Sequence, residues 1–410
     1  MKILVYSLNY SPELTGVGKF TGEMGEDLAS HGHEVRVICA PPYYPEWARK
    51  PGFRYCWWSR DVIGSVVVYR CPIFIPSRQS GLLRALHLLS FAISSLPVLL
   101  YQIFWRPRFV WMAMPTFLNI PAGIFFARLV GAKTWLHIQD FEVDAAVATG
   151  LFRNGLLARL ARFVETRIYA GVDHVSTISD GMAAFFRKSK LPGKAVSLIP
   201  NWFDFAGFEC IAEDDPRVAV YRAEFGFPID RILALYSGNI GNKQGLELII
   251  EAAQRCPDIF FVICGSGSER QRLQEMSAML TNVVWLDLQP VDSYRRLLLC
   301  ANIHLMTQLP SAHDLVMPSK LNALMASGRC TLLTALPDTD LYVTGSRGGV
   351  PVSYGDIDAI KAALDRLAAL PDQRRQLGMA GREFVLQHFS RAEVTRRLHL
   401  EMCDAEKIRD

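Results

Sequence analysis

The sequence predicts an α/β protein built from two doubly wound, Rossmann-like domains. Short apolar runs alternate with helix-like stretches along nearly the whole chain, as in parallel sheets joined by crossover helices. A glycine-rich turn follows the first strand candidate of each half, at Gly16 and Gly18 and again at Gly238 and Gly241. The chain of 410 residues is also too long for one ordinary core, because domains usually contain roughly 100–200 residues.

The first domain is expected to span residues 1–200. Its strand candidates are short apolar runs, and helical patterns such as 18–30 and 154–170 lie between them. Such an alternation favours a doubly wound sheet. The expected strands are residues 2–8, 34–39, 66–70, 109–112, 134–138, 174–177 and 197–199.

The second domain is expected over residues 201–385, after a linker at about 201–230 that is rich in Asp, Pro and Gly. Its pattern again alternates between apolar runs and helical stretches. The expected strands are 232–236, 259–264, 283–286, 303–307, 330–334 and 350–353, and the expected helices are 245–255, 268–279, 292–299, 320–327 and 357–369.

The final segment, residues 386–410, is expected to form a helix that packs back on the first domain. Val394, Leu398 and Met402 recur at helical spacing on one apolar stripe, and such a stripe needs a partner surface. The second domain already has enough helices to cover its own sheet, so the first domain is the expected host.

The turn at residues 237–247 predicts a phosphate site. It joins an apolar strand candidate to a helical pattern and contains Gly238, Asn239, Gly241 and Lys243. Free N–H groups and the dipole at the start of a helix favour an anion, and the lysine adds a full positive charge. Because the first domain has a similar turn, we expect two nucleotide-type folds facing one cleft.

A dinucleotide-dependent dehydrogenase is disfavoured by the first glycine turn. Gly16, Gly18 and Gly22 are spaced one residue too widely for the dinucleotide fingerprint, and no acid follows the second strand candidate. The nine cysteines form no CxxC pair and no metal-ligand spacing, so we expect a reducing compartment, no cofactor and no metal. The first residues resemble a strand rather than a signal peptide, which favours the cytoplasm.

Positive charge is concentrated in the first half of the chain. Residues 47–139 contain 11 Lys and Arg residues and one acid, Asp61, interleaved with Trp57, Trp58 and other aromatic residues. No nucleic-acid-binding motif accompanies this region. Basic and aromatic residues also gather at anionic membrane surfaces, so we expect peripheral association with the inner face of the cytoplasmic membrane, with a solvated basic face as the alternative.

The apolar segment 82–105 bears on that expectation. Its length approaches the roughly 20 residues of a membrane-spanning helix, but it contains His87, Pro97 and Gln102. We therefore expect one or two helices, broken near Pro97, that partly pack on the first domain and partly contact lipid. A wholly buried helix pair is the alternative.

Several ordered motifs together resemble the GT-B glycosyltransferases of family 4. Within that family they are most similar to the colanic-acid-type exopolysaccharide glycosyltransferases, often called fucosyltransferases, and the resemblance spans nearly the whole chain. The motifs are residues 9–16, 40–45, 137–144, 199–201, 236–247, 264–267 and 318–321.

The resemblance implies roles for residues of the second domain. Lys243 and Lys320 would balance the diphosphate of a nucleotide sugar as it leaves. Gly265 and Gly267 would lie along the nucleotide, with Gly238, Asn239 and Gly241 near the diphosphate. The donor sugar would be recognised by the segment containing His313, Asp314, Pro318 and Ser319.

In the first domain, the resemblance implies that Gly16 and Gly18 let the backbone approach donor and acceptor. His137 matches a family histidine near the donor sugar, although a core histidine is the alternative. Asp140, Glu142 and Asp144 follow the same strand candidate, and one of them could orient or deprotonate the acceptor hydroxyl.

This chain departs from the family pattern at two positions. Most members of the family carry two glutamates there, the second of which binds the ribose, whereas this chain has Leu315 and Ala323. Asp314 could cover part of the missing role. The departure leaves the nucleotide open.

The sequence and the resemblance together predict a retaining, metal-independent glycosyltransferase. Its donor would be a nucleotide diphosphate sugar, with GDP-fucose the first expectation and a UDP-sugar the second. Its acceptor would be a lipid-diphosphate-linked glycan used in cell-surface polysaccharide synthesis. The alternative is a catalytically idle, sugar-nucleotide-binding partner in a polysaccharide assembly complex.

Overall fold

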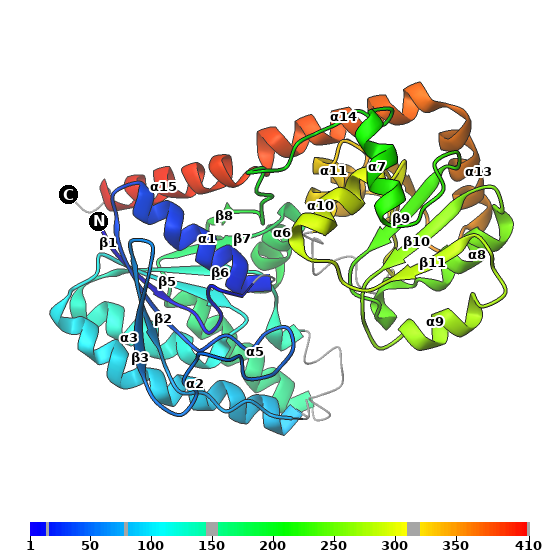
Figure 1. Cartoon of the computed structure of the whole chain (residues 1–410). Helices are drawn as coiled ribbons and strands as arrows, with labels where there is room; N and C mark the ends of the chain where they lie inside the picture. Colours follow the sequence, from blue (N-terminus) through cyan, green and yellow to red (C-terminus); the bar gives the residue numbers. More distant parts are fainter. Residues whose placement is uncertain (14–15, 78–80, 145–154, 310–319, 408–410) are drawn as a thin grey trace. The chain divides into compact units, whose positions relative to one another are not determined.

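A computed structural model describes residues 1–13, 16–77, 81–144, 155–309 and 320–407. The chain divides into two compact units, Met1–Pro200 with Thr395–Asp410, and Asn201–Val394 (Figure 1). Each unit is an α/β fold with a largely parallel sheet, which confirms the fold class predicted from the sequence.

The first unit contains an eight-stranded sheet in the order β3-β4-β2-β1-β5-β6-β7-β8. All neighbouring strands are parallel except β3 and β4, which form an antiparallel edge pair. The sequence did not indicate β3, because its residues alternate between partly and fully exposed and carry no apolar run. The strands are β1 (Lys2–Tyr6), β2 (Glu34–Cys39), β3 (Ser59–Ile63), β4 (Val66–Arg70), β5 (Phe109–Met114), β6 (Lys133–Ile138), β7 (His174–Thr177) and β8 (Val196–Leu198).

Strand β1 is the inner strand on which this sheet is organised. Ile3, Leu4 and Val5 are fully buried, as expected for a parallel strand covered on both faces. It pairs with β2 on one side and β5 on the other. The order of strands therefore extends away from β1 in both directions across the sheet. The helices of the unit are α1 (Gly16–Ser30), α2 (Gly81–Tyr101), α3 (Ile120–Val130), α5 (Gly155–Ala170) and α6 (Asp180–Ser189), with short 3-10 turns η1 (Gln102–Phe104) and η2 (Phe117–Asn119).

Helix α2 is continuous through Pro97, whereas a break was expected there. Its buried residues are His87, Phe91, Ser95 and Leu99, one per turn, so only a narrow stripe faces the unit. Most of its remaining surface is exposed. By length and composition alone, Gly81–Phe104 could cross a membrane, which is weak evidence because core helices of soluble proteins pass the same test.

The second unit contains a six-stranded parallel sheet in the order β11-β10-β9-β12-β13-β14. The first strand again lies inside, between β10 and β12. Its strands are β9 (Leu233–Ser237), β10 (Phe260–Cys264), β11 (Val283–Leu286), β12 (Ile303–Met306), β13 (Cys330–Thr334) and β14 (Gly349–Val352). Its helices are α7 (Pro216–Glu224), α8 (Glu247–Arg255), α9 (Arg270–Met276), α10 (Val291–Cys300), α11 (Lys320–Ala326), α12 (Asp340–Gly345), α13 (Ile357–Ala369) and α14 (Pro371–His388), with η3 (Asn242–Gln244).

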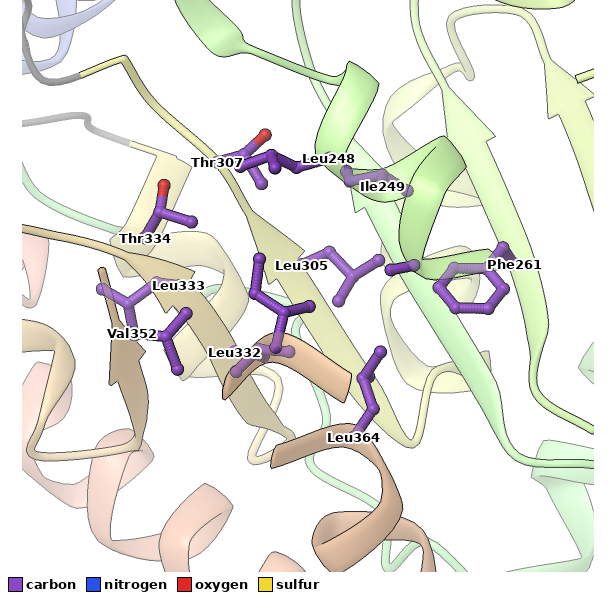
Figure 2. Close-up of a pocket in the computed structure, with 12 residues that line it drawn as sticks. Leu248, Ile249, Phe261, Leu305, Thr307, Leu332, Leu333, Thr334, Val352 and Leu364 are labelled. Atoms are coloured by element: carbon purple, nitrogen blue, oxygen red, sulfur yellow. The ribbon is translucent and has the colours of Figure 1, made fainter. Parts of the chain in front are cut away.

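Two apolar clusters cover the two faces of this sheet. Alternate residues of β9 enter different clusters, Leu233 and Leu235 one and Ala234 and Tyr236 the other, as the two-residue period of a strand requires. Figure 2 shows side chains from α8, β10, β12, β13 and α13 around a small space on one face. Its volume is about 20 Å³, far below the several hundred Å³ of a ligand pocket, so it is a packing void.

The last helix, α15 (Arg391–Lys407), follows α14 after a short break. The side chains of Val394, Leu398 and Met402 are fully buried. From Thr395 onward the chain groups with the first unit (Figure 1, red). Arg108 and Glu406 form an ion pair of 3.0 Å in that unit.

Two segments near the ends of the second unit are hydrogen-bonded to each other. The Phe203 N–H donates to the Phe389 carbonyl over 2.8 Å, and the Arg391 N–H donates to the Phe203 carbonyl over 3.0 Å. These bonds hold residues 203 and 389–391 side by side, although they lie far apart in the sequence.

The glycine-rich loops after β9 and β10 pack directly on each other. The Ile240 N–H donates to the Ser266 carbonyl over 2.8 Å, and the Glu269 N–H donates to the Ile240 carbonyl over 3.0 Å. Gly265 and Gly267 have positive φ angles of 152° and 157°, and an added Cβ would overlap the carbonyl oxygens of Gly238 and Ile240 respectively. Both positions therefore require glycine for reasons internal to the fold.

We expect Gly267→Ala to destabilise the second unit more than Gly355→Ala. Both glycines have positive φ, but Gly355 has no atom within 4 Å of an added Cβ. The control should lose about 1–2 kcal/mol from backbone strain alone, and Gly267→Ala about 1–3 kcal/mol more from overlap. Thermal melting of the full chain measures both, and equal losses would contradict this packing.

Candidate functional site

Lys320 lies at the carboxyl end of β9 in the second unit. Its Nζ is 3.3 Å from the Tyr236 hydroxyl and 4.5 Å from the centre of that ring. The Tyr236 hydroxyl in turn donates to the Asn239 carbonyl over 2.7 Å. A Cβ at Gly238 would be 3.8 Å from Lys320 Nζ. The sequence-predicted residues Gly238, Asn239 and Lys320 are therefore brought together, through a tyrosine that sequence reasoning had not selected.

The charge of Lys320 has no carboxylate partner among the described residues. Burial lowers the pKa of its ammonium to about 8, because removing a cation from water disfavours the charged form. An anion bound beside Lys320 would stabilise the charged ammonium and so offset the cost of its burial. The group is thus a partly desolvated cation at the edge of a parallel sheet, which is a suitable place for a phosphate.

Lys243 lies on η3, next to the same loop. Its side chain is exposed, and its carbonyl accepts a hydrogen bond from the Leu309 N–H over 3.0 Å. Gly241 precedes η3, and its N–H donates to Gln244 Oε1 over 3.1 Å. Lys243 therefore adjoins the chain that leads out of β12, where the remaining expected donor residues occur. Those residues, His313, Asp314, Pro318 and Ser319, lie outside the described residues, as does Leu315.

Gly265 and Gly267 were expected to lie along the nucleotide. Their hydrogens face the carbonyls of the neighbouring loop, so fold packing alone accounts for the glycines. Ala323 is partly buried on α11 against the apolar core, and it offers no polar group for a ribose.

In the first unit, Gly18 lies against a buried carboxylate that sequence reasoning missed, and Gly16 lies against the Tyr44 ring. A Cβ at Gly18 would overlap Glu13 Oε2. Glu13 is 3% exposed, and it accepts hydrogen bonds from the Tyr43 and Tyr44 N–H groups over 3.2 and 3.1 Å and from Asn9 Nδ2 over 2.9 Å. Burial raises the pKa of Glu13. The sequence did contain a signal for Glu13, because it is an acid placed just before the glycine turn in a region that has few acids.

His137 lies in the core of the first unit. It is 5% exposed, its ring stacks on Trp111 with centroids 5.4 Å apart, and its Nδ1 is 2.9 Å from Ser176 Oγ. Burial lowers the pKa of His137 to about 3, so the ring is neutral at physiological pH. This environment matches the alternative of a core histidine.

The acids that follow β6 have different environments. Asp144 forms an ion pair with Lys190, which also pairs with buried Glu165. Glu142 is partly exposed, and its Oε2 accepts a hydrogen bond from the Phe117 N–H over 2.9 Å. Burial, and secondarily the charge of Asp140, raise the pKa of Glu142 to about 7. Glu142 can therefore exchange a proton near neutral pH, as a general acid or base must.

Comparison with protein-family models assigns both parts of the chain. Residues 15–202 match the "glycosyl transferase 4-like domain" and residues 219–384 match "glycosyl transferases group 1". A colanic acid biosynthesis glycosyl transferase of Escherichia coli (strain K12), WcaI, is 42% identical over 382 residues, which cover 90% of this chain and 93% of that protein.

Solved structures of similar fold agree with these matches. Sucrose-phosphate synthase from Thermosynechococcus elongatus superposes with a TM-score of 0.78 at 16% identity, covering 99% of each chain. Anabaena Alr3699/HepE in complex with UDP gives a TM-score of 0.71 at 12% identity, covering 98% of this chain and all of the other. The two family matches and the E. coli relative show that the chain belongs to the GT-B glycosyltransferases of family 4.

Proposed function

We propose that this protein is a retaining glycosyltransferase that moves a sugar from a nucleotide diphosphate sugar to a lipid-diphosphate-linked oligosaccharide. The observation that carries the proposal is the Lys320 ammonium, which lies beside Tyr236 and the Gly238–Gly241 turn and has no carboxylate partner among the described residues. The E. coli relative is named for colanic acid biosynthesis, which supports a role in exopolysaccharide or other cell-surface polysaccharide synthesis.

Lys320 and Lys243 would neutralise the diphosphate as it becomes the leaving group. Negative charge grows on that group when the sugar bond breaks, and fixed cations stabilise the transition state more than the ground state. The acceptor hydroxyl would attack from the face that the diphosphate leaves, and the diphosphate oxygen would take its proton. This route preserves the anomeric configuration and requires neither a protein nucleophile nor a metal.

The donor is proposed as GDP-fucose, with a UDP-sugar as second choice. Anabaena HepE has been solved with UDP and with UDP-glucose, which supports a nucleotide diphosphate sugar as the ligand class. The proposed donor contacts are Gly238, Asn239, Gly241 and the segment with His313, Asp314, Pro318 and Ser319. A panel of nucleoside diphosphates in a thermal-shift assay separates GDP from UDP, because a ligand stabilises the folded state by mass action.

The acceptor is proposed to bind the first unit near Gly16, Gly18, Asp140 and Glu142. Glu142 would orient the acceptor hydroxyl, since its carboxyl exchanges a proton near neutral pH. His137 is not included, because its ring is enclosed by core side chains.

A membrane-facing surface would give access to a lipid-linked acceptor. The face of α2 that points away from the unit exposes Leu82 and Ile93 at 74% and 59%, and Phe104 of η1, which follows α2, is exposed at 87%. Helix α3 packs beside α2 with Phe125 exposed at 68%. Exposed Arg84 lies on α2. Apolar and basic groups on one surface favour peripheral attachment to anionic lipid, so we propose association with the inner face of the cytoplasmic membrane.

We expect Lys320→Ala and Lys243→Ala each to weaken nucleoside diphosphate binding. Loss of one charged hydrogen bond costs about 1.5–3 kcal/mol, or roughly 10- to 150-fold in affinity. Lys361→Ala is the matched control, since Lys361 is a partly exposed lysine of the same unit that pairs with Asp365. Calorimetric titration and kcat/KM measure the effect. Full activity in both variants would exclude this placement of the leaving group.

We expect the protein to bind anionic vesicles. The binding should weaken as the salt concentration rises, because salt screens electrostatic attraction beyond about a Debye length. Ile93→Ser and Phe104→Ser should reduce binding. Met279→Ser is the control, because Met279 is a 92% exposed apolar residue of the second unit. Co-sedimentation measures binding, and equal binding to neutral and anionic vesicles would rule out the electrostatic part.

We expect Glu142→Gln to raise the melting temperature at pH 8 and to leave it nearly unchanged below about pH 4.3, where the carboxyl is protonated in both the folded and the unfolded state. The folded-state pKa of Glu142 is about 7, above the usual value of about 4.3 for a free glutamate. Its contribution to stability is therefore present at low pH and lost as pH rises through 7, whereas glutamine stays neutral. Glu383→Gln, on an exposed part of α14, is the control.

The same variant tests the role of Glu142 in the reaction. If Glu142 orients the acceptor, Glu142→Gln should raise KM for the acceptor and leave the affinity for the nucleoside diphosphate unchanged. Unaltered acceptor kinetics, together with the expected pH-dependent melting, would show that the shifted carboxyl has no part in acceptor binding.

A further inference from the structure

Three metal-capable side chains meet in the first unit, away from the proposed donor and acceptor residues. They are His33, which immediately precedes β2, and His399 and Cys403 on α15. His33 Nε2 and His399 Nδ1 are 2.8 Å apart, and Cys403 Sγ is 3.9 Å from His399 Nδ1. One ligand atom from each residue lies within 4.8 Å of the other two.

The fold holds these groups in place from both sides. Leu398 and Met402 are fully buried, and this fixes the rotation of α15. His399 and Cys403, each one position further along, are four residues apart and therefore lie on one helix face. His33 is fixed by its neighbour Glu34, which begins β2 and pairs in parallel with Lys2. All three residues are partly buried.

The chemistry of the three groups suits a borderline-soft divalent cation. Two imidazoles and a thiolate form a donor set that zinc uses in proteins.

The distances also approach those of a tetrahedral site. Zinc–nitrogen bonds of about 2.0 Å and a zinc–sulfur bond of about 2.3 Å place the nitrogens about 3.3 Å apart and each nitrogen about 3.5 Å from the sulfur. The two measured separations, 2.8 and 3.9 Å, are therefore within about 0.5 Å of these values. The His33–Cys403 pair lies within 4.8 Å, so it would need to close by at most about 1.3 Å, which rotamer adjustment on a fixed backbone can supply.

We propose that His33 Nε2, His399 Nδ1 and Cys403 Sγ bind one divalent cation of the zinc class. The fourth position would be open to water. The His31 ring, stacked on His399 with centroids 4.7 Å apart, covers one side of the cluster. The site is structural, because it ties α15 to the start of β2 between residues 366 positions apart in the chain. It does not depend on the proposed transferase function.

Cobalt(II) titration of the untagged, chelator-treated full chain under reducing conditions tests the site. The wild type should bind one equivalent with saturable absorption of a cobalt–thiolate bond, and excess zinc should abolish that absorption. Zinc should also raise the melting temperature, because a ligand of the folded state stabilises it. Cys403→Ser and His399→Ala should each weaken metal binding at least tenfold.

Controls separate this cluster from other thiols and from misfolding. Cys56→Ser removes an exposed cysteine outside the cluster and should bind cobalt as the wild type does. The metal-free melting temperature of Cys403→Ser should stay near that of the wild type, because serine is nearly isosteric. Undiminished cobalt affinity in Cys403→Ser, or the lack of saturable binding by the wild type, would overturn the proposal.

Discussion

The inner position of the first strand is the constraint on which each unit depends. β1 lies between β2 and β5, and β9 lies between β10 and β12, so each is an inner strand of its sheet. The right-handed crossovers on the two sides of that strand therefore place their helices on opposite faces of the sheet. The loops that follow neighbouring strands then diverge at the carboxyl end of the inner strand, which leaves a crevice there. Gly16 and Gly18 in the first unit and Gly238 and Lys243 in the second all follow that end. Ligand-binding residues can gather there without interrupting the sheet.

Strand positions and fold class could be predicted because buried parallel strands are continuous apolar runs. Ile3–Val5 and Leu233–Tyr236 are buried on both faces, so their sequence signal is strong. The edge strand β3 has one partner and a polar, exposed surface, so it carries no such signal. The continuity of α2 through Pro97 was also mispredicted. Proline removes only one helix hydrogen bond, and local sequence does not reveal whether the rest of the helix compensates.

The sequence predicted which loops contribute to the candidate site, but it predicted fewer of the side-chain contacts within the site. The glycine turn and Lys320 were identified from sequence, yet the link through Tyr236 depends on a contact between residues 84 positions apart. Glu13 was missed because its burial arises from the Tyr43 and Tyr44 amides, which reach it from a different loop. His137 illustrates the reverse case. Its place near a strand end suggested chemistry, whereas its contacts with Trp111 and Ser176 account for it as a core residue.

Electrostatics distinguishes the groups that remain as functional candidates. A buried cation without a partner is unfavourable, and the Arg222 guanidinium avoids this by donating to backbone carbonyls and to Asn302. Within the part of the chain that the structure describes, the Lys320 ammonium contacts only the ring and hydroxyl of Tyr236. The hydroxyl already donates to Asn239, so it can present its oxygen to the ammonium while two of the three ammonium hydrogens remain for an incoming anion. Tyr236 therefore fixes the lysine without neutralising it, which leaves the charge available for an anion.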